Sequence, residues 1–418
     1  MKLHLLACAL GCALLIGCGG DDTPPEGPIK VGLLATIHDP FFASVSNGNR
    51  LAVQEVNAAG GVLGRQIELV IADVGESPAS AVDGAQQLVD QGVVFILGPD
   101  FAETAFAAAE YLYPKEIPLI SMAGGITISW PQIQPAGDRY AFSLSMPEDR
   151  VLRAAISATA VDPGMCSSLA IVVEDRPDAA DGLAAMMDEL TTTSITLTSA
   201  MMVQADRASH ATTVAALIPM APDCVLLDMN ATPSGVFIKE WNEMAGPAVK
   251  WIRPRPPLLP QLIGSTGDPA LVTGLIGAQP ISNDPSSAQF QEFQDAFVTT
   301  YGEEPTLPFA PFMYDETALA LLSIQAAGST AGADVRNALL RVSGNNGGGT
   351  AEPPYGPTQL DEALVWITES AGDFDYEGAS SSCNMTEGGF VVQKIEVYTV
   401  TDAAMGTVMR NRVVTPPM

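Results

Sequence analysis

The sequence predicts an α/β protein with two lobes, each a doubly wound parallel β-sheet covered by helices. Apolar strand-like runs alternate with amphipathic helical runs between residues 29 and 121. The same alternation starts again near Glu148 and continues to about residue 278. The chain has 418 residues, more than one compact hydrophobic core normally organises. Nearly continuous apolar strands separated by helices are typical of parallel sheets covered on both faces.

In the first unit, short apolar runs predict strands, and apolar residues at helical spacing predict helices. Ser77-Pro78 is a favourable helix start, because serine can cap a helix and proline at the first helical position loses no hydrogen bond. Gly60-Gly61 ends the preceding helix. The expected strands are 30–35, 67–72, 93–97 and 118–121, and the expected helices are 47–58, one from Ser77, and 104–113.

The second unit and the segment after it follow the same criteria. The expected strands are 169–174, one within 195–203, 225–229 and 275–278, with helices over 179–190, 210–220 and 234–245. Four further helices are expected over 288–301, 311–327, 334–343 and 358–371, and one or two strands within 390–400. In open α/β sheets, ligands bind at the carboxyl ends of the strands. Two such sheets that face each other form a cleft, which a hinge can close.

The first residues predict export. Met1-Lys2 is a short basic start, and 5–16 is an apolar run too short to span a bilayer. The run ends in Leu-Ile-Gly-Cys, which resembles the bacterial lipobox, so Cys18 is the expected site of lipid attachment. The alternative is a plain signal peptide in which Cys18 is incidental. Residues 1–18 are then the leader, and the polar 19–28 (GGDDTPPEGP) a flexible tether.

Charge and cysteine content narrow the function classes. The formal net charge of −29 repels nucleic acid and anionic lipid, so neither is an expected partner. Solubility explains the acidity, and a cation site is the alternative. Without the leader, Cys166, Cys224 and Cys383 remain. A Cys166–Cys224 disulfide is one candidate pairing, because each cysteine directly precedes a strand-like run, and Cys383 would then be a free thiol. The cysteine spacing does not indicate a metal site.

Several motifs in one order carry a family resemblance. They begin with 30–35 and the run LAVQEVNAAGGVLGR over 51–65, and continue through Asp73, Ser77-Pro78, Gly98-Pro99 and 117–121 (IPLIS). Later motifs are 314–318 (YDETA), 327–329 (AGS) and 376–380 (YEGAS). Together they resemble the type I periplasmic binding proteins, specifically the Leu/Ile/Val-binding family of branched-chain amino acid ABC importers. The resemblance covers almost the whole mature chain.

This resemblance implies a Venus-flytrap fold whose chain crosses between the lobes three times. Lobe one is then 29–144 plus 280–376, and lobe two is 147–278 plus 379–418, with Cys383 in or near the hinge. The implied function is to bind a small polar solute, amino-acid-like or anionic, for an ABC permease. The protein is expected to be a monomer held to the cell envelope by its lipid alone, facing the periplasm or exterior, with no cofactor.

The resemblance also places ligand contacts on lobe one, where this chain departs from its relatives. After Gly98-Pro99, relatives offer a serine hydroxyl, and this chain has Ala102, followed by Glu103 and Thr104. Backbone N–H groups at that helix start can still bind an anion, whereas Glu103 either opposes a carboxylate or simply faces water. In the next loop, 121–125 (SMAGG), Gly125 replaces the usual threonine. Ala123, Gly124 and Gly125 either approach the ligand by backbone or only form a turn.

On lobe two, relatives place an acid after the strand that follows Lys250, where it pairs with the ligand ammonium. Here that stretch is WIRPRPP over 251–257, and Arg255 falls near the acid's place. A two-residue shift of the alignment makes Arg253 the other candidate. Arginine favours carboxylate, phosphate or sulfonate groups and repels an ammonium. Alternatively, both arginines are solvated on a proline-stiffened loop.

Three more residues are candidate contacts by position. Phe41 lies, with Phe42, in the first loop, where relatives put an aromatic over the ligand; Asn230 follows a lobe-two strand; and Tyr314 lies near a family contact position. Each is otherwise an ordinary packing residue. Because all three usual anchors of a zwitterion are altered, we expect the ligand not to be leucine, isoleucine or valine.

Other function classes have weaker support. The sequence has no Gly-x-Ser-x-Gly elbow, Walker loop or Gly-x-Gly-x-x-Gly fingerprint, so no enzyme is expected. Its three histidines are His4, His38 and His210, which are far apart. The alternative function is a sensor that presents its closed form to a signalling receptor. A third class is a scaffold whose cleft has lost its ligand.

Overall fold

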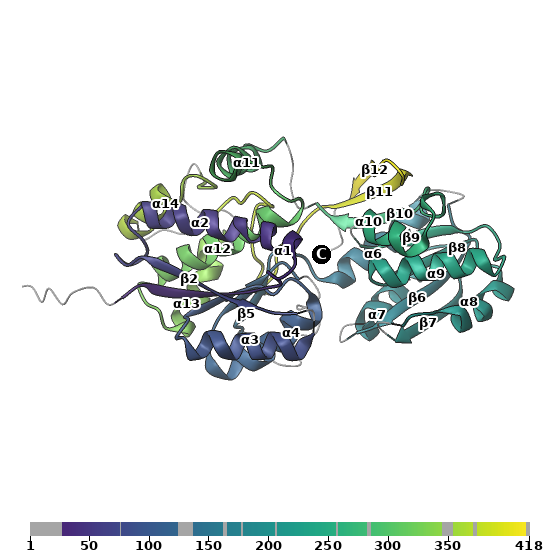
Figure 1. The fold of residues 1–418 in the computed structure, drawn as a ribbon, viewed down its shortest axis with the longest axis horizontal. Helices are drawn as coiled ribbons and strands as arrows, with labels where there is room; N and C mark the ends of the chain where they lie inside the picture. Colours follow the sequence, from purple (N-terminus) through teal and green to yellow (C-terminus); the bar gives the residue numbers. More distant parts are fainter. Residues whose placement is uncertain are drawn as a thin grey trace, which may run out of the picture.

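The computed structural model describes residues 27–75, 77–123, 137–161, 165–176, 179–204, 207–255, 258–281, 286–344, 354–370 and 374–414. Cys18, Gly124 and Gly125 lie outside this part of the chain. The described residues form two lobes side by side, each with its own sheet (Figure 1). Within these residues, no helix has both the length and the apolar content needed to cross a membrane.

Lobe one contains a five-stranded parallel sheet in the order β2-β1-β3-β4-β5. β1 is buried almost throughout because its sequence, IKVGLLA, is nearly all apolar and both faces of the sheet are covered. The strands are β1 (Ile29–Ala35), β2 (Ile67–Asp73), β3 (Phe95–Leu97), β4 (Leu119–Ser121) and β5 (Ala141–Ser143).

Helices cover both faces of this sheet. α3 and α4 pack on one face, and α2 and α12 on the other. α2 and α12 lie close together at Gly48, where a Cβ atom would be 2.2 Å from the Ala310 carbonyl oxygen. The lobe-one helices are α1 (Pro40–Val45), α2 (Asn47–Ala58), α3 (Pro78–Asp90), α4 (Ala102–Leu112), η1 (Tyr113–Lys115), α11 (Ala288–Tyr301), α12 (Phe309–Ala327), α13 (Gly332–Val342) and α14 (Leu360–Glu369).

Lobe two contains a seven-stranded sheet in the order β12-β11-β10-β9-β8-β6-β7, in which β11 runs antiparallel to the other strands. Its strands are β6 (Ser168–Asp175), β7 (Thr196–Gln204), β8 (Cys224–Asp228), β9 (Lys250–Arg253), β10 (Ile276–Pro280), β11 (Ile395–Asp402) and β12 (Thr407–Val414). α6 and α7 cover one face, and α8, α9 and α10 the other. The helices are α6 (Glu148–Val161), α7 (Ala179–Leu190), α8 (Ala211–Leu217), η3 (Ile218–Met220), α9 (Ala231–Glu243), α10 (Leu259–Thr266) and η4 (Pro269–Leu271).

The crossings between lobes fix the direction of both sheets. β5 ends at Ser143, and the chain then enters lobe two, since Leu144 packs in the lobe-one core and Met146 in a lobe-two core. β10 ends at Pro280, and the chain returns to α11 in lobe one. Because the strands from β1 to β9 run parallel to the crossing strand of their own sheet, their carboxyl ends also point toward the junction of the lobes (Figure 1). The predicted arrangement, with strand ends facing a shared junction, is confirmed.

The third crossing lies later in the sequence than predicted. Asp315, buried in α12, accepts hydrogen bonds from the Tyr376 hydroxyl (2.8 Å) and from the backbone N–H groups of Ala379 (2.9 Å) and Ser380 (2.7 Å). The core of lobe one also includes Ala379, Cys383, Met385 and Val391. The chain therefore enters lobe two between residues 391 and 395, and not at 377–378, because Asp315 and this core hold 379–391 on lobe one.

Cys166 and Cys224 form a disulfide with Cα atoms 5.8 Å apart, and Cys383 is a buried free thiol. Cys224 is the first residue of β8, and Cys166 lies just before β6. The disulfide therefore ties the amino ends of two neighbouring strands, at the opposite edge of the sheet from the junction.

Candidate functional site

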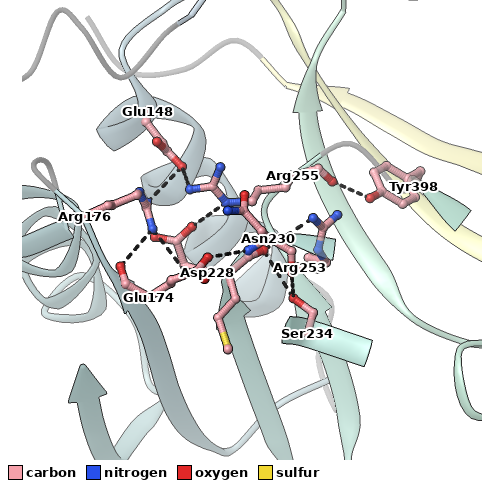
Figure 2. Close-up of polar contacts among 10 residues, drawn as sticks. Glu148, Glu174, Arg176, Asp228, Asn230, Ser234, Arg253, Arg255 and Tyr398 are labelled. Atoms are coloured by element: carbon pink, nitrogen blue, oxygen red, sulfur yellow. Dashed lines mark hydrogen bonds and ion pairs between the residues drawn. The ribbon is translucent and has the colours of Figure 1, made fainter. Parts of the chain in front are cut away.

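Three neighbouring strands of lobe two carry ionisable residues at their carboxyl ends. They are Glu174 on β6, Asp228 on β8 and Arg253 on β9, which meet because β9, β8 and β6 are adjacent and parallel. Glu148 begins α6, Arg176 follows β6 and Arg255 follows β9, and these three side chains reach the same place (Figure 2). We call these six residues the lobe-two cluster.

The centre of the lobe-two cluster is Asp228, whose side chain is fully buried. Its Oδ2 accepts from Arg176 at 2.6 Å, and its Oδ1 accepts from the Nε of Arg255 at 2.9 Å. Glu148 Oε1 pairs with the same arginines, at 3.0 Å to Arg176 and 2.5 Å to Arg255. Two carboxylates thus bridge two guanidinium groups in a closed arrangement (Figure 2).

Burial alone raises the pKa of the Asp228 carboxyl, but the charges of Arg176 and Arg255 outweigh it, so its pKa lies below the usual value. Asp228 therefore stays ionised. An ionised, doubly bound carboxylate holds both guanidinium groups in fixed orientations. Arg255 keeps 20% of its side chain exposed, whereas Arg176 keeps 5%. Arg255 is thus the arginine of this pair that a solute can reach.

Arg253 is a correction to the sequence prediction. Its side chain is buried, with 1% of the residue exposed, and burial lowers its pKa to about 10. It donates to the Met229 carbonyl at 3.4 Å. Because it is the last residue of β9 and is covered by neighbouring elements, its side chain is not exposed to a solute in this structure. Arg255 is held further by its carbonyl, which accepts from the Tyr398 hydroxyl at 2.6 Å.

Asn230 caps the start of α9 and is exposed, as a ligand contact requires. Its backbone N–H donates to Glu174 Oε2 at 2.8 Å, and its carbonyl accepts from the Ser234 hydroxyl at 2.7 Å. Its side chain makes no capping hydrogen bond. The backbone is therefore fixed, while the amide projects near the lobe-two cluster (Figure 2).

On lobe one, Phe41 lies in α1, directly after β1, and is 41% exposed. Asp39 caps this helix by accepting from the Phe41 N–H at 2.8 Å. The ring of Phe41 contacts Phe42 and Phe309, with centroids 5.2 and 5.7 Å away. Phe41 is thus an exposed aromatic at a strand end that faces the junction.

The loop after β3 leads into α4, which begins at Ala102. Glu103 lies in the first turn, and the Thr104 hydroxyl is turned inward to donate to the Phe101 carbonyl at 2.9 Å. No side chain caps the helix start at Phe101. Asp100, which sequence reasoning missed, lies in the same loop, and burial raises its pKa to about 7. This loop therefore holds an acid that titrates near neutral pH.

In the next loop, Ala123 is 6% exposed and its carbonyl accepts from the Ser143 hydroxyl at 3.1 Å. The Ser121 hydroxyl donates to the Pro99 carbonyl at 2.6 Å. These bonds join the ends of β4 and β5 to the loop after β3. Ala123 is therefore a structural part of the junction edge, and Gly124 and Gly125 lie outside the described residues.

Tyr314 is a second correction. It is fully buried in α12, where its hydroxyl donates to Glu55 on α2 and accepts from the Thr358 N–H at 3.2 Å. Its ring packs against Phe293 with centroids 5.4 Å apart. The residue joins α2, α11 and α12 in the core of lobe one because both its ring and its hydroxyl are satisfied there. Tyr314 is therefore a core residue and not a ligand contact.

The structure brings together Arg255 and Asn230 on lobe two (Figure 2). On lobe one, Phe41 and residues 102–104 begin helices that follow the neighbouring strands β1 and β3. Sequence reasoning missed Glu148, Arg176 and Asp228. Each has a recognisable signal, because Arg176 and Asp228 follow or end a continuous apolar run and Glu148 starts a helix. A charge at the carboxyl end of a buried strand would have indicated Arg176 and Asp228.

Comparison with known proteins agrees with this architecture. The family model described as periplasmic binding protein matches residues 28–363. The Leu/Ile/Val-binding protein BraC3 of Rhizobium johnstonii is 31% identical over 96 residues, which cover 22% of this chain and 26% of that protein. The similar segment thus spans about a quarter of that relative's length.

Solved structures match over nearly the whole chain. A leucine binding protein from Thermotoga maritima has a TM-score of 0.71 at 15% identity, covering 93% of this chain and 99% of that chain. A solute binding protein of an ABC transporter from R. palustris, in complex with benzoate, has a TM-score of 0.66 at 17% identity, covering 94% and 98%. At such identities the likeness shows the fold. With the family match, it establishes that this chain belongs to the periplasmic binding proteins, non-enzymatic solute binders that work outside the cytoplasm.

Proposed function

We propose that this chain is the lipid-anchored solute-binding protein of an ABC importer and that its solute carries a carboxylate held by Arg255. Of the amino-acid-like and anionic solutes that the sequence predicts, the exposed guanidinium of Arg255 favours an anion. Arg255 carries the proposal: it is partly exposed at the junction and its orientation is fixed by Asp228 at 2.9 Å and Glu148 at 2.5 Å. A guanidinium fixed in this way presents planar donors to a carboxylate without a large entropy cost.

An ammonium group finds no comparable partner on lobe two. Asp228 is fully buried between two arginines, and Glu148, 12% exposed, binds the same two. The lobe-two cluster is formally neutral, with three arginines and three acids, but its acids are buried or bound to arginines. Arg255, with 20% of its side chain exposed, is therefore the charge of the cluster that is most open to a solute.

The ligands of similar proteins do not distinguish an amino acid from an anionic solute. One such protein is named a leucine binding protein, and another is in complex with benzoate. The same fold therefore serves an amino acid and an aromatic acid, and the choice must come from the residues at the strand ends.

Isothermal titration calorimetry with a panel of carboxylates and amines tests the role of Arg255. We expect carboxylates to bind and amines of equal size not to bind. Arg255→Gln should weaken carboxylate binding about 10- to 100-fold, because a charge-assisted hydrogen bond contributes about 1.5–3 kcal/mol. Arg255→Lys keeps the charge but loses the planar fork of donors, so its affinity for carboxylates should lie between those of the wild type and Arg255→Gln.

Arg336→Gln is the matched control, since Arg336 on α13 also binds an acid, Asp138, but this acid precedes β5 and so lies at the end of that strand opposite the junction. It should leave carboxylate binding unchanged. Equal carboxylate affinity in the wild type and Arg255→Gln would reject the proposal.

The anchor and the transport role need separate tests. Intact protein expressed with its leader should partition into detergent, and Cys18→Ala should move it to the aqueous phase. Deletion of the gene should abolish uptake of the bound carboxylate if the protein serves an importer. Normal uptake together with a lost transcriptional response would instead identify a sensor.

A further inference from the structure

Four phenylalanine rings gather on the junction side of lobe one. Phe41 contacts Phe42 and Phe309, with ring centroids 5.2 and 5.7 Å apart, and Phe42 contacts Phe101 at 5.6 Å. All three contacts are edge-to-face. We call Phe41, Phe42, Phe101 and Phe309 the phenylalanine cluster.

The cluster is assembled from three separate helix starts. Phe41 and Phe42 lie in the first turn of α1, Phe101 immediately precedes α4, and Phe309 begins α12. α1 and α4 follow β1 and β3, whose carboxyl ends face the junction. The position of the rings therefore follows from the sheet direction, independently of the lobe-two cluster.

None of the four rings is fully buried. Phe41 is 41% exposed, and the other three are partly exposed. A contiguous exposed aromatic patch costs hydration free energy in the free protein and is typical of a surface that binds an apolar partner. Four of the 14 phenylalanines in the chain meet here. The patch is therefore a cluster of rings and not a set of isolated exposed side chains.

The polar groups beside the cluster disfavour a second carboxylate on the solute. The hydroxyls of Thr104 and Ser121 donate inward to the carbonyls of Phe101 (2.9 Å) and Pro99 (2.6 Å). Ala102 has no hydroxyl, and burial makes Asp100 a partly neutral acid near pH 7. Glu103 adds a negative charge at the start of α4, which disfavours a second carboxylate on the solute.

We infer that the solute is an aromatic monocarboxylate without an ammonium group, with its carboxylate at Arg255 and its ring on the phenylalanine cluster. This inference rests on the proposed function and narrows it. Aromatic pairs prefer edge-to-face or offset contacts, so an aromatic guest extends the packing that the four rings already show. A saturated ring of the same size gains burial but not this contact.

Two matched ligand pairs test the inference by calorimetry. Benzoate should bind about three- to tenfold more tightly than cyclohexanecarboxylate, since an aromatic pair contributes about 0.5–1.5 kcal/mol beyond burial. 3-Phenylpropionate should bind at least about tenfold more tightly than phenylalanine, which adds only an ammonium group. Phe41→Leu should bring benzoate and cyclohexanecarboxylate to equal affinity. Val365→Ala, at a residue that is 55% exposed on α14, should leave the preference unchanged.

The outcomes separate this inference from the proposed function. If cyclohexanecarboxylate binds as tightly as benzoate, or phenylalanine more tightly than 3-phenylpropionate, carboxylate binding stands and the aromatic class is wrong. If no carboxylate binds to the folded wild-type protein, the proposed function and this inference are both wrong. Circular dichroism and melting temperature of Phe41→Leu establish that the variant is folded.

Discussion

Asp228 holds Arg255 at the edge of the lobe-two sheet: the buried Oδ1 accepts from the Nε of the arginine at 2.9 Å, while 20% of the arginine side chain stays exposed. The acid is the last residue of β8, and the arginine follows β9, so a rigid strand fixes a loop residue. Preorganisation of this kind lowers the ordering cost when a solute binds.

Replacing Asp228 should therefore damage stability and binding together. Asp228→Asn leaves Arg176 and Arg255 without their buried anion, and breaking a buried ion pair costs about 3–5 kcal/mol. Urea unfolding measures this loss. Asp188→Asn, which removes the exposed partner of Arg153, should cost less than about 1 kcal/mol. A loss at Asp228 no larger than at Asp188 would contradict the central role of Asp228.

The raised pKa of Asp100 predicts that the stability of the folded chain depends on pH. Its pKa of about 7 in the folded chain lies above its unfolded value of about 3.9, so the folded state keeps a proton that the unfolded state releases. Raising the pH from 4 to 7 therefore lowers stability, and above 7 this contribution levels off. Asp100→Asn should be stabilised relative to wild type by an amount that grows over this range to about 2 kcal/mol, since partial exposure screens the full effect.

The difference between Asp100→Asn and wild type removes the contribution of separate acids, such as Glu377, whose pKa burial also raises to about 7, and retains that of Glu316, whose pKa the charge of Asp100 helps to raise. Thermal melting of both proteins at pH 4, 6 and 8 measures this difference in stability. A constant difference across the three values would show that Asp100 titrates normally. The same protonation favours anion binding, so wild-type affinity for a carboxylate should fall between pH 6 and 8.

The disulfide should affect stability without affecting binding. Cys166 and Cys224 are 58 residues apart and lie at the amino ends of β6 and β8. Cys166→Ser/Cys224→Ser should cost about 2–4 kcal/mol, the usual range for a native disulfide. Carboxylate affinity below the melting temperature should not change, because Arg255 lies at the opposite edge of the sheet. Weaker binding in the double variant would show that the two edges are coupled.

Branched-chain amino acids are expected not to bind. The resemblance places Ala102 where relatives have a serine hydroxyl, and it places Arg255, which is bound to Glu148, near the position of their acid. Calorimetry with leucine, isoleucine and valine should show no binding in the micromolar range. Micromolar affinity for any of them would overturn the view that the zwitterion anchors are lost.

Regular elements were predicted from the sequence where an apolar pattern was long. The helices over 179–190 and 288–301 were predicted with the bounds that the structure shows, because each has a clear apolar face. β12 was missed, since Arg410-Asn411-Arg412 interrupts its apolar pattern. α1 was missed because a helix of six residues is too short to show a helical repeat of apolar residues.

The candidate site was harder to predict, because its contacts join distant segments. Glu148 and Asp228 are 80 residues apart, and only the order β9-β8-β6 brings them to one place. Arg253 and Arg255 look equivalent in the sequence, yet one ends a covered strand and the other begins a partly exposed loop. Tyr314 was predicted as a ligand contact for a related reason. Its hydroxyl binds Glu55 in the core of lobe one, and this contact with a distant residue cannot be deduced from its position in the sequence.

A crystal structure of the mature chain grown with the tightest-binding carboxylate of the panel tests the account most directly. We predict the carboxylate within hydrogen-bonding distance of Arg255, the body of the solute against Phe41, and the two lobes closer together than in Figure 1. A solute bound elsewhere, or bound at the junction without touching Arg255, would contradict the account.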